Sequence, residues 1–379
     1  MVKAMTLNRR AFCSALIAAS PLAVRPARSA APLSVTDMAG RTVELARSPT
    51  RIVLLEARDI VSMALLHPDP ASLIVGWAAA DRLDSPQLQG RLTRDRRIEI
   101  IGRQTPDTIS FEGLIGLAPD LVVTNLHMTP HGEDDPLVER LGAIGIPVVF
   151  SDVSSNDRSE ATASADTLSD LRNHMRMWGE ILGAGSRSDA FCTFFATHLK
   201  NVETRLKDAA PVTTYLEIQS TLDDCCWAAG SGIWGKLLDL AGGRSLPGVT
   251  AQWYQKLQLE YLLATPHDVY IASGGGWSSG GRPAIGPGLT VAEGRAGLER
   301  MVGRTGFAQL PSVQNRRVHG IWTGLITLLP LNILFIEVAA KWLHPDRCAE
   351  LDPAATLKEI NDRFLAMPIE GALWVSLQE

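Results

Sequence analysis

The sequence FEGLIGLAPDLVVTNLHMTPHGEDDPLVERLGAIGIPVVFSD occupies residues 111–152 and carries the pattern that decides the fold. Two short runs in it, at 120–125 and 147–152, are apolar and rich in β-branched residues. Apolar residues at helical spacing lie between them at 136–145. Strands that are apolar throughout are typical of a parallel sheet covered by helices on both faces. This stretch therefore predicts a strand–helix–strand unit of an α/β protein.

The same alternation extends toward the N-terminus. Further buried strands are expected at 51–56, 72–77 and 98–102. Helices are expected between the strands, at 60–66 and 111–118. The first part of the chain is therefore expected to form an α/β unit with a mostly parallel sheet.

The middle of the chain shows no strand pattern from about Ser159 to Leu206. Its apolar residues recur three and four positions apart, which predicts one long helix or two near-collinear helices. A helix of about 20 residues or more spans roughly 30 Å, the diameter of a small domain. We expect it to be a rigid connector between two halves.

Strands return in the second half of the chain, alternating again with helices. The expected strands are 213–219, 268–274 and 316–322, and the expected helices are 233–242, 259–265, 331–343 and 355–365. The residues thus predict two α/β halves joined by a long helix. The expected segments are an N-terminal signal (1–31), an N-terminal lobe (32–155), a connecting helix (156–209) and a C-terminal lobe (210–379).

One internal similarity links the halves. Glu112 opens a short helix, and Asp120, eight residues later, opens a strand. Glu260 and Asp268 repeat this spacing in the second half. One such match is common by itself, but between two α/β halves it supports two similar lobes.

Residues 1–31 have the features of an export signal. Arg9 and Arg10 precede Phe12, an apolar run too short to span a bilayer follows, and small residues lie near its end. The paired arginines indicate the twin-arginine route, so we expect a periplasmic protein. A plain N-terminal helix is the alternative, but the prolines in and after this stretch disfavour it.

Composition excludes several classes of protein. The chain has 379 residues, of which 46% are hydrophobic and 20% charged, which is too apolar for a disordered chain. The net charge is −5, and removal of residues 1–31 would lower it to about −10, so no nucleic-acid partner is expected. The cysteines that follow residue 31 are too few for a disulfide scaffold. These cysteines are Cys192, Cys225, Cys226 and Cys348. The simplest interpretation of the adjacent pair, Cys225 and Cys226, is that they are two small residues in a loop.

Sequence templates for catalysis fail. The motif GWSSG (276–280) resembles a nucleophile elbow, but the residues after Ser278 cannot start the helix that the elbow needs. His127 and His131 lie four apart, but Pro130 and Gly132 disfavour a helix that would place them on one face. We therefore expect no enzyme, no cofactor and no metal ion held by the protein itself.

Arginine and tryptophan are concentrated after the expected strands. Ligands of open α/β sheets bind beyond the carboxyl ends of the strands. Guanidinium groups bind anionic oxygens, and indole rings offer flat apolar contact. A bulky, partly anionic, planar or aromatic ligand would suit this combination. The candidate ligand-binding residues are Arg58, Trp77, Arg82, Arg103, His127, Trp227, Trp253, Tyr254, Trp277, Arg282 and Trp322, whereas Trp178, Trp342 and Trp374 are assigned to packing.

The sequence resembles the exported substrate-binding proteins of ABC importers for iron–siderophore, haem or cobalamin. The matching stretches follow the order of that family along most of the chain: 36–59, 101–125, 229–243, 259–271, 310–322 and 341–346. The resemblance implies two Rossmann-like lobes bridged by a long α-helix, with a ligand cleft between the lobes. It also implies that Glu112 and Glu260 dock onto an ABC permease dimer in the inner membrane. Stabilisation of a helix dipole is the alternative role for these two acids.

The resemblance therefore implies a periplasmic, monomeric carrier that captures an iron chelate, expected to be a ferric siderophore. A cobalamin or haem carrier of the same family is the alternative. A third hypothesis is an enzyme or cluster-binding subunit on this fold, for which only Cys225 and Cys226 lie at a suitable strand end.

Overall fold

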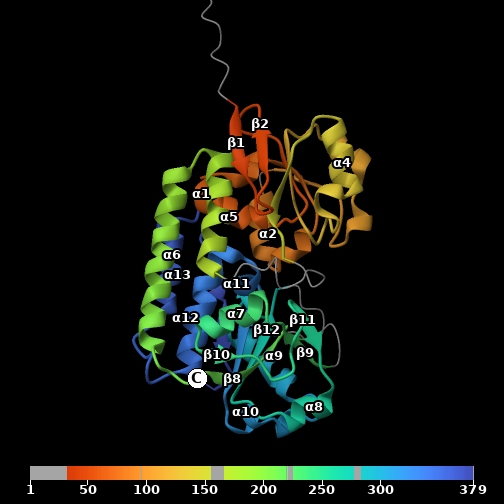
Figure 1. Ribbon diagram of the computed structural model, residues 1–379. Coiled ribbons are helices and arrows are strands. Elements are labelled where there is room, and N and C mark those ends of the chain that lie inside the picture. The colour runs from red at the N-terminus through yellow and green to blue at the C-terminus, as the bar shows by residue number, and fades with distance from the viewer. Residues whose placement is uncertain are drawn as a thin grey trace, which may run out of the picture. The chain divides into compact units, whose positions relative to one another are not determined.

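The computed structural model describes residues 32–94, 96–154, 166–218, 220, 225–276 and 283–378, and the backbone alone of Ile233. The predicted export signal, Trp277 and Arg282 lie outside the described residues. Residues Pro32–Glu379 form one compact unit, which contains two α/β lobes (Figure 1). The boundaries expected near 155 and 210 stay predictions.

The N-terminal lobe is built on the parallel sheet that the sequence predicts. Its strand order is β5-β4-β3-β6-β7, and every neighbouring pair is parallel. The strands are β3 (Ile52–Leu54), β4 (Ile74–Trp77), β5 (Glu99–Ile100), β6 (Leu121–Asn125) and β7 (Val148–Asp152). The first strand lies in the middle, so the chain crosses the sheet in both directions and helices cover both faces.

Side chains of β3 alternate between two hydrophobic clusters. Ile52 and Leu54 belong to the cluster that includes α1 (Asp59–Leu66), and Val53 belongs to the one that includes α3 (Phe111–Gly116) and α4 (Pro136–Ala143). This alternation follows from the two-residue period of a strand. Ser110 and Asp135 cap α3 and α4 by accepting hydrogen bonds from backbone amides in the first turn. A hairpin of β1 (Leu33–Thr36) and β2 (Thr42–Leu45), and helix α2 (Pro86–Thr93), complete the lobe.

The connecting segment differs from the expectation. It forms two helices, α5 (Thr167–Leu182) and α6 (Gly185–Leu206), which lie side by side rather than end to end (Figure 1). Gly183 adopts a left-handed conformation, φ 64°, and ends α5. The prediction of near-collinear helices was wrong because one glycine in this conformation reverses the chain. Helix α6, 22 residues or about 33 Å long, packs on α5 and on α12 (Asn332–Leu343) of the C-terminal lobe.

The C-terminal sheet is mixed rather than mostly parallel. Strands β8 (Val212–Glu217), β12 (Val269–Gly274) and β14 (Val318–Trp322) are parallel, as expected. Antiparallel strands extend this core on both sides. The additions are β9 (Trp227–Ala229) and β11 (Tyr254–Lys256) on one side and β16 (Trp374–Ser376) on the other; β10 (Gly243–Arg244) pairs with β8, and β13 (Gly286–Pro287) pairs with β15 (Gly371–Ala372).

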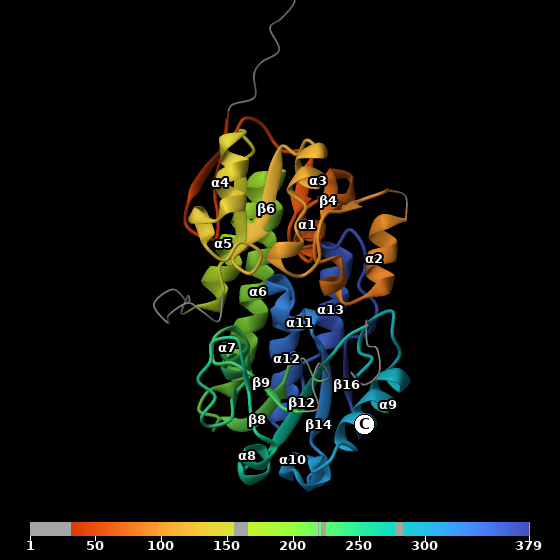
Figure 2. The ribbon, with the colours of Figure 1, turned by 90° about the vertical axis from the view of Figure 1, so that its right-hand side faces the viewer.

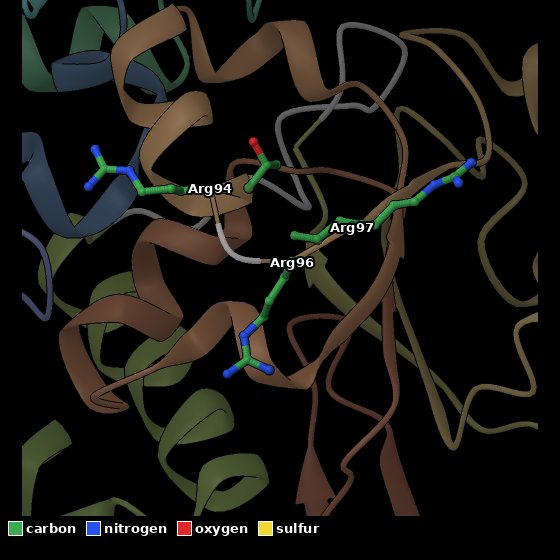
Figure 3. A pocket seen from close by; sticks show the side chains of 5 residues that line it. Arg94, Arg96 and Arg97 are labelled. Carbon is green, nitrogen blue, oxygen red and sulfur yellow. The ribbon is translucent and has the colours of Figure 1, made fainter.

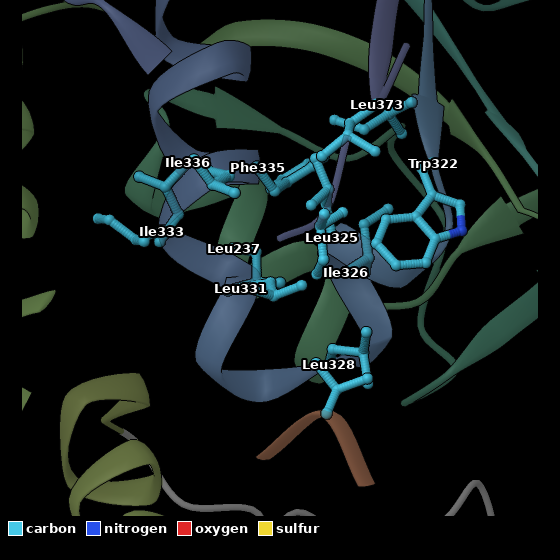
Figure 4. Packing of buried hydrophobic residues seen from close by; sticks show 14 of the residues in the cluster. Leu237, Trp322, Leu325, Ile326, Leu328, Leu331, Ile333, Phe335, Ile336 and Leu373 are labelled. Carbon is cyan, nitrogen blue, oxygen red and sulfur yellow. The ribbon is translucent and has the colours of Figure 1, made fainter. Parts of the chain in front are cut away.

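Helices of the C-terminal lobe pack into a core that also includes side chains of the N-terminal lobe. All residues of α12 except Lys341 are buried, and Figure 4 shows its side chains packed beside Trp322 and Leu325. One hydrophobic cluster contains Leu54 of β3 as well as Phe335 of α12. The lobes therefore share a continuous apolar core. The remaining helices are α7 (Ile233–Leu240), α8 (Leu259–Ala264), α9 (Val291–Val302), α10 (Pro311–Gln314), α11 (Gly324–Thr327) and α13 (Pro353–Arg363).

The internal similarity has a structural counterpart. The amide of Asp120 donates to the carbonyl of Arg51, 2.9 Å away, just before β6 joins β3. The amide of Asp268 donates to the carbonyl of Thr213, 2.8 Å away, where β12 joins β8. Each acid thus begins a strand against the central strand of its sheet.

Candidate ligand site at the strand ends

The carboxyl edge of the N-terminal sheet carries a buried carboxylate between two arginines. Glu56 follows β3 and is almost inaccessible to solvent. Arg58 donates to it through Nε and Nη2, at 2.9 and 2.8 Å, and Arg82 through Nη1, at 2.9 Å. Asn125, the last residue of β6, places its Nδ2 3.5 Å from the same carboxylate. The parallel strands end at one edge, and this brings residues far apart in sequence together.

The two neighbouring arginines keep the Glu56 carboxyl ionised. Burial alone would raise the pKa of Glu56, but the Arg58 and Arg82 guanidiniums bring it down from 4.5 to about 2. Despite burial, the neighbouring Glu56 carboxylate also raises the pKa of Arg58. Glu56, Arg58 and Arg82 together carry one net positive charge, and Asp152 at the end of β7 also interacts electrostatically with Arg58. Such a group can attract an anionic oxygen.

His127 extends the group beyond β6. Arg82 Nη2 lies 2.5 Å from His127 Nε2, and the carbonyl oxygen of Gln104 lies 2.8 Å from the same nitrogen, so the tautomer of the ring decides which of these two contacts is a hydrogen bond. Burial and the charge of Arg82 lower the pKa of His127, so the ring is neutral at pH 7. Arg82 therefore contacts both Glu56 and His127.

An aromatic row from the C-terminal lobe meets His127. The Trp253 ring stacks on the His127 ring with centroids 6.2 Å apart. Trp253 lies 6.4 Å from Tyr254, and Tyr254 lies edge-on to Trp227 at 5.4 Å. Lys256 stands over the Trp227 ring at 5.7 Å, because these two residues face each other across the β9–β11 pair. The three aromatic residues are half-buried.

The structure thus brings together Arg58, Arg82, His127, Trp227, Trp253 and Tyr254 of the candidate residues. Arg103 lies after β5 and is exposed, with its backbone amide bonded to Thr108. Glu56 was missed as a candidate ligand-site residue. The signal for Glu56 was a single charged residue that ends an apolar run two positions before Arg58.

Two tryptophans were wrongly expected to lie in loops facing a ligand. Trp77 and Trp322 are the last residues of β4 and β14, and their exposed fractions are 1% and 0%. Their rings pack into the shared core because the final side chain of an inner strand points into a helix layer. Trp178 and Trp342 are buried and Trp374 is half-buried against the core, in line with the packing role expected for them.

The structure also differs from the expectation for the adjacent cysteines. Cys225 and Cys226 form a disulfide directly before β9, rather than two unpaired small residues in a loop. Cys192 and Cys348 are free thiols. The part of the chain that the structure describes has no group of three or more His, Cys, Asp or Glu residues able to hold a metal ion.

A separate basic hollow lies between α2 and β5. It measures about 520 Å³ and is lined by Thr93, Arg94, Arg96, Arg97 and Ile98. Figure 3 shows the three arginines pointing away from one another. Arg96 pairs with Asp69 at 2.7 Å and Arg97 with Glu99 at 2.8 Å. Since these guanidiniums diverge and two are already paired with acids, they do not converge on one ligand.

Glu112 and Glu260 occupy matching positions. Each is the second residue of a six-residue helix, α3 or α8, and each is exposed. They lie on different lobes, on the helices directly before β6 and β12.

Comparisons with known proteins agree with this architecture. A family model described as "Periplasmic binding protein" matches residues 64–321. The crystal structure of FepB, a TroA-like periplasmic binding protein from Veillonella parvula, has a TM-score of 0.76 at 22% identity; the match covers 92% of this chain and 100% of FepB. None of the curated proteins compared with the sequence matches it.

Two further solved structures have the same fold. MolA from Haemophilus influenzae, a molybdate periplasmic binding protein solved with molybdate bound, has a TM-score of 0.68 at 17% identity, covering 89% of this chain and 99% of MolA. A protein of an ABC-type Fe3+-hydroxamate transport system from Saccharomonospora viridis has a TM-score of 0.59 at 19% identity, covering 83% of this chain and 99% of that chain. Among the described residues, no helix combines the length and the apolar character needed to cross a membrane.

Proposed function

The chain belongs to the periplasmic binding protein family, whose members bind solutes for ABC transporters and are not enzymes, and on this premise we propose that it captures a ferric siderophore. The positively charged group around Glu56 carries the proposal. Arg58 and Arg82 offer guanidinium donors to the anionic oxygens of a chelate, and the Trp253 ring stacks on His127, which Arg82 contacts.

The geometry favours a preorganised site. Glu56 holds both arginines in fixed directions, so little side-chain entropy is lost when a ligand binds. The aromatic row of Trp253, Tyr254 and Trp227 supplies flat apolar contact on the other lobe. The proposal of an iron chelate follows the Fe3+-hydroxamate transport system named for one of the structural neighbours.

We further propose that the loaded protein docks on an ABC permease dimer in the inner membrane. Glu112 and Glu260 are exposed on both lobes and would pair with basic residues of the two permease subunits. Export through residues 1–31 and a monomeric state belong to the same proposal.

Tryptophan fluorescence tests the ligand. The purified protein is titrated with a ferric hydroxamate, a ferric catecholate, haemin, cobalamin and molybdate. We expect saturable quenching at micromolar concentration or below by a ferric siderophore. Binding of haemin or cobalamin alone would assign the alternative carrier role, and binding of molybdate alone would replace the iron chelate with a simple oxyanion. Absence of binding by all five would remove the support for a chelate.

The variant Arg82→Gln tests the site. This substitution removes the charged donor of Arg82 but leaves Glu56 paired with Arg58, so we expect the protein to fold. We expect the Kd for the ferric siderophore to rise roughly 10- to 100-fold, the worth of one charge-assisted hydrogen bond. Arg94→Gln, at an exposed arginine of the same lobe, is the matched control and should leave the Kd unchanged. An unaltered Kd in Arg82→Gln would place the ligand elsewhere.

A further inference from the structure

The turn that carries Arg82 is strained at both ends. Ala79 and Asp84 flank the 3₁₀ turn Ala80–Leu83, and both adopt left-handed conformations, with φ of 53° and 51°. For residues other than glycine this conformation costs roughly 1 kcal/mol or more. Such strain persists only where surrounding contacts hold it in place.

Contacts from the C-terminal lobe hold the Asp84 end. The amide of Gly276 donates to the carbonyl of Asp84 at 2.9 Å. The hydroxyl of Ser85 donates to the carbonyl of Pro287 at 3.2 Å, in a fully buried setting. A Cβ added to Gly275 would overlap the Asp84 carboxylate, so the Asp84 side chain would have to move.

The contact continues along α2. Arg91 donates through Nη1 to the carbonyl of Pro368 at 2.9 Å and lies 3.6 Å from the carboxylate of Glu370. Apolar side chains of α1 and α2 meet Leu365, Met367 and Ile369, leaving a cavity of only about 10 Å³. Figure 2 shows α2 next to this part of the C-terminal lobe.

We propose that Gly276 and Asp84 form a second junction between the lobes, in addition to helix α6. This junction holds the Arg82 turn against Glu56 and His127. Asp84 is then a positioning residue for the ligand site. The inference rests on the proposed function only in its ligand-binding part. Because the lobes are joined both at α6 and at this junction, Arg82 cannot withdraw when the lobes rock, and the site stays preorganised.

The variant Gly276→Ala tests the junction. Its Cβ would lie 2.9 Å from Pro86 Cδ and 3.0 Å from the Asp84 carbonyl oxygen, so these atoms must move apart. Gly90→Ala is the matched control. Gly90 lies on α2, the helix that follows Asp84, and a Cβ there meets nothing within 4 Å. Arg91→Ala, which removes only the outer contacts, is a second junction variant in case Gly276→Ala does not fold.

Two measurements need no ligand. Hydrogen exchange of the Arg82 and Asp84 amides, which donate within the turn, should become about tenfold faster in Gly276→Ala, the worth of one hydrogen bond. The His127 ring, followed by NMR, should titrate at higher pH than in the wild type, because Arg82 leaves Nε2 while the Glu56 and Arg58 charges remain nearby. Gly90→Ala should match the wild type in both, and Arg91→Ala should shift both in the direction of Gly276→Ala by a smaller amount.

Ligand affinity is the third measurement. For whichever probe the wild type binds, the Kd should rise about tenfold in Gly276→Ala and stay constant in Gly90→Ala. If a folded Gly276→Ala keeps wild-type exchange and His127 titration, the N-terminal lobe alone holds the turn and the junction has no positioning role. If Gly276→Ala does not fold, wild-type exchange and titration in Arg91→Ala would equally rule out that role. If no probe binds even the wild type, the proposed function fails, while exchange and NMR still decide the junction.

Discussion

Glu56 is the acid that links the two arginines of the candidate ligand site. Its carboxylate is buried yet ionised, since two guanidiniums surround it. A buried ion pair of this kind contributes little net stability compared with an apolar pair, but removal of one partner is costly. Its role is therefore to fix the directions of Arg58 and Arg82.

The acid stability of the protein should depend on Glu56. Its folded pKa of about 2 lies below the ordinary value of 4.5. Folding therefore favours the ionised form, and this contribution is fully present above about pH 4.5 and disappears as the pH falls through about 2. In Glu56→Gln the arginines lose their charged partner, and we expect the free energy of unfolding at pH 7 to fall by about 3 kcal/mol.

Urea unfolding over a series of pH values measures both effects. The wild type should lose stability relative to Glu56→Gln as the pH falls from about 4.5 toward 2. Glu133→Gln is a control at an exposed acid of the same lobe and should keep the wild-type profile. Parallel profiles for the wild type and Glu56→Gln would show that folding does not lower the pKa of Glu56.

At the scale of elements, the α5–α6 connection has the largest effect on the architecture. Gly183 turns the chain, and the two helices then pack so closely that a Cβ added to Gly179 would lie 3.0 Å from Ser188 Cβ. The helical pattern was evident in the sequence, but a glycine that ends a helix and a glycine inside one look alike there. The choice depends on whether the second helix can bury its apolar side against the first.

The variant Gly183→Ala should destabilise this turn. The position has φ 64°, so alanine there costs about 1 kcal/mol although it meets no neighbouring atom. Gly185→Ala, two residues later, also meets no neighbour and lies in the first turn of α6, so it should be neutral or slightly stabilising. Urea unfolding of both variants measures the difference. Equal stabilities would mean that the left-handed turn at Gly183 is absent in solution.

The β9–β11 pair is the second element that decides the site. It carries Trp227, Tyr254 and Lys256, and it follows directly on the Cys225–Cys226 disulfide. Three-residue strands give no periodicity that a sequence pattern can detect. The aromatic residues were therefore recognised as candidates, but their row was not.

At the scale of the whole molecule, the lobes share one apolar core, and each presents an exposed acid at a matching position, Glu112 or Glu260. A shared core and a second junction leave little freedom for wide opening. A permease that receives the ligand would then contact both lobes at a nearly constant separation. The two acids on α3 and α8 suit that requirement.

Charge reversal at both acids tests the docking. In Glu112→Lys with Glu260→Lys, we expect uptake by cells that carry the cognate permease to fall at least tenfold, because attraction becomes repulsion. Ligand affinity should stay within twofold, since neither acid touches the strand-end group. Glu299→Lys with Glu359→Lys, at other helix positions, is the charge-matched control. A loss of affinity in the docking variant would instead place these acids in the ligand site.

Local patterns along the chain were enough to predict the α/β class, the two lobes, most of the strands and helices, and the arginines at the strand ends. These follow from local periodicity and from the rule that parallel strands end at one edge. The folded structure was needed to show that Trp77 and Trp322 are core, that Glu56 joins Arg58 to Arg82, that α5 folds back on α6, and that His127 meets Trp253. The physical reason is that burial and pairing depend on which surfaces pack together, and residues distant in sequence meet only after the helices and sheets have packed.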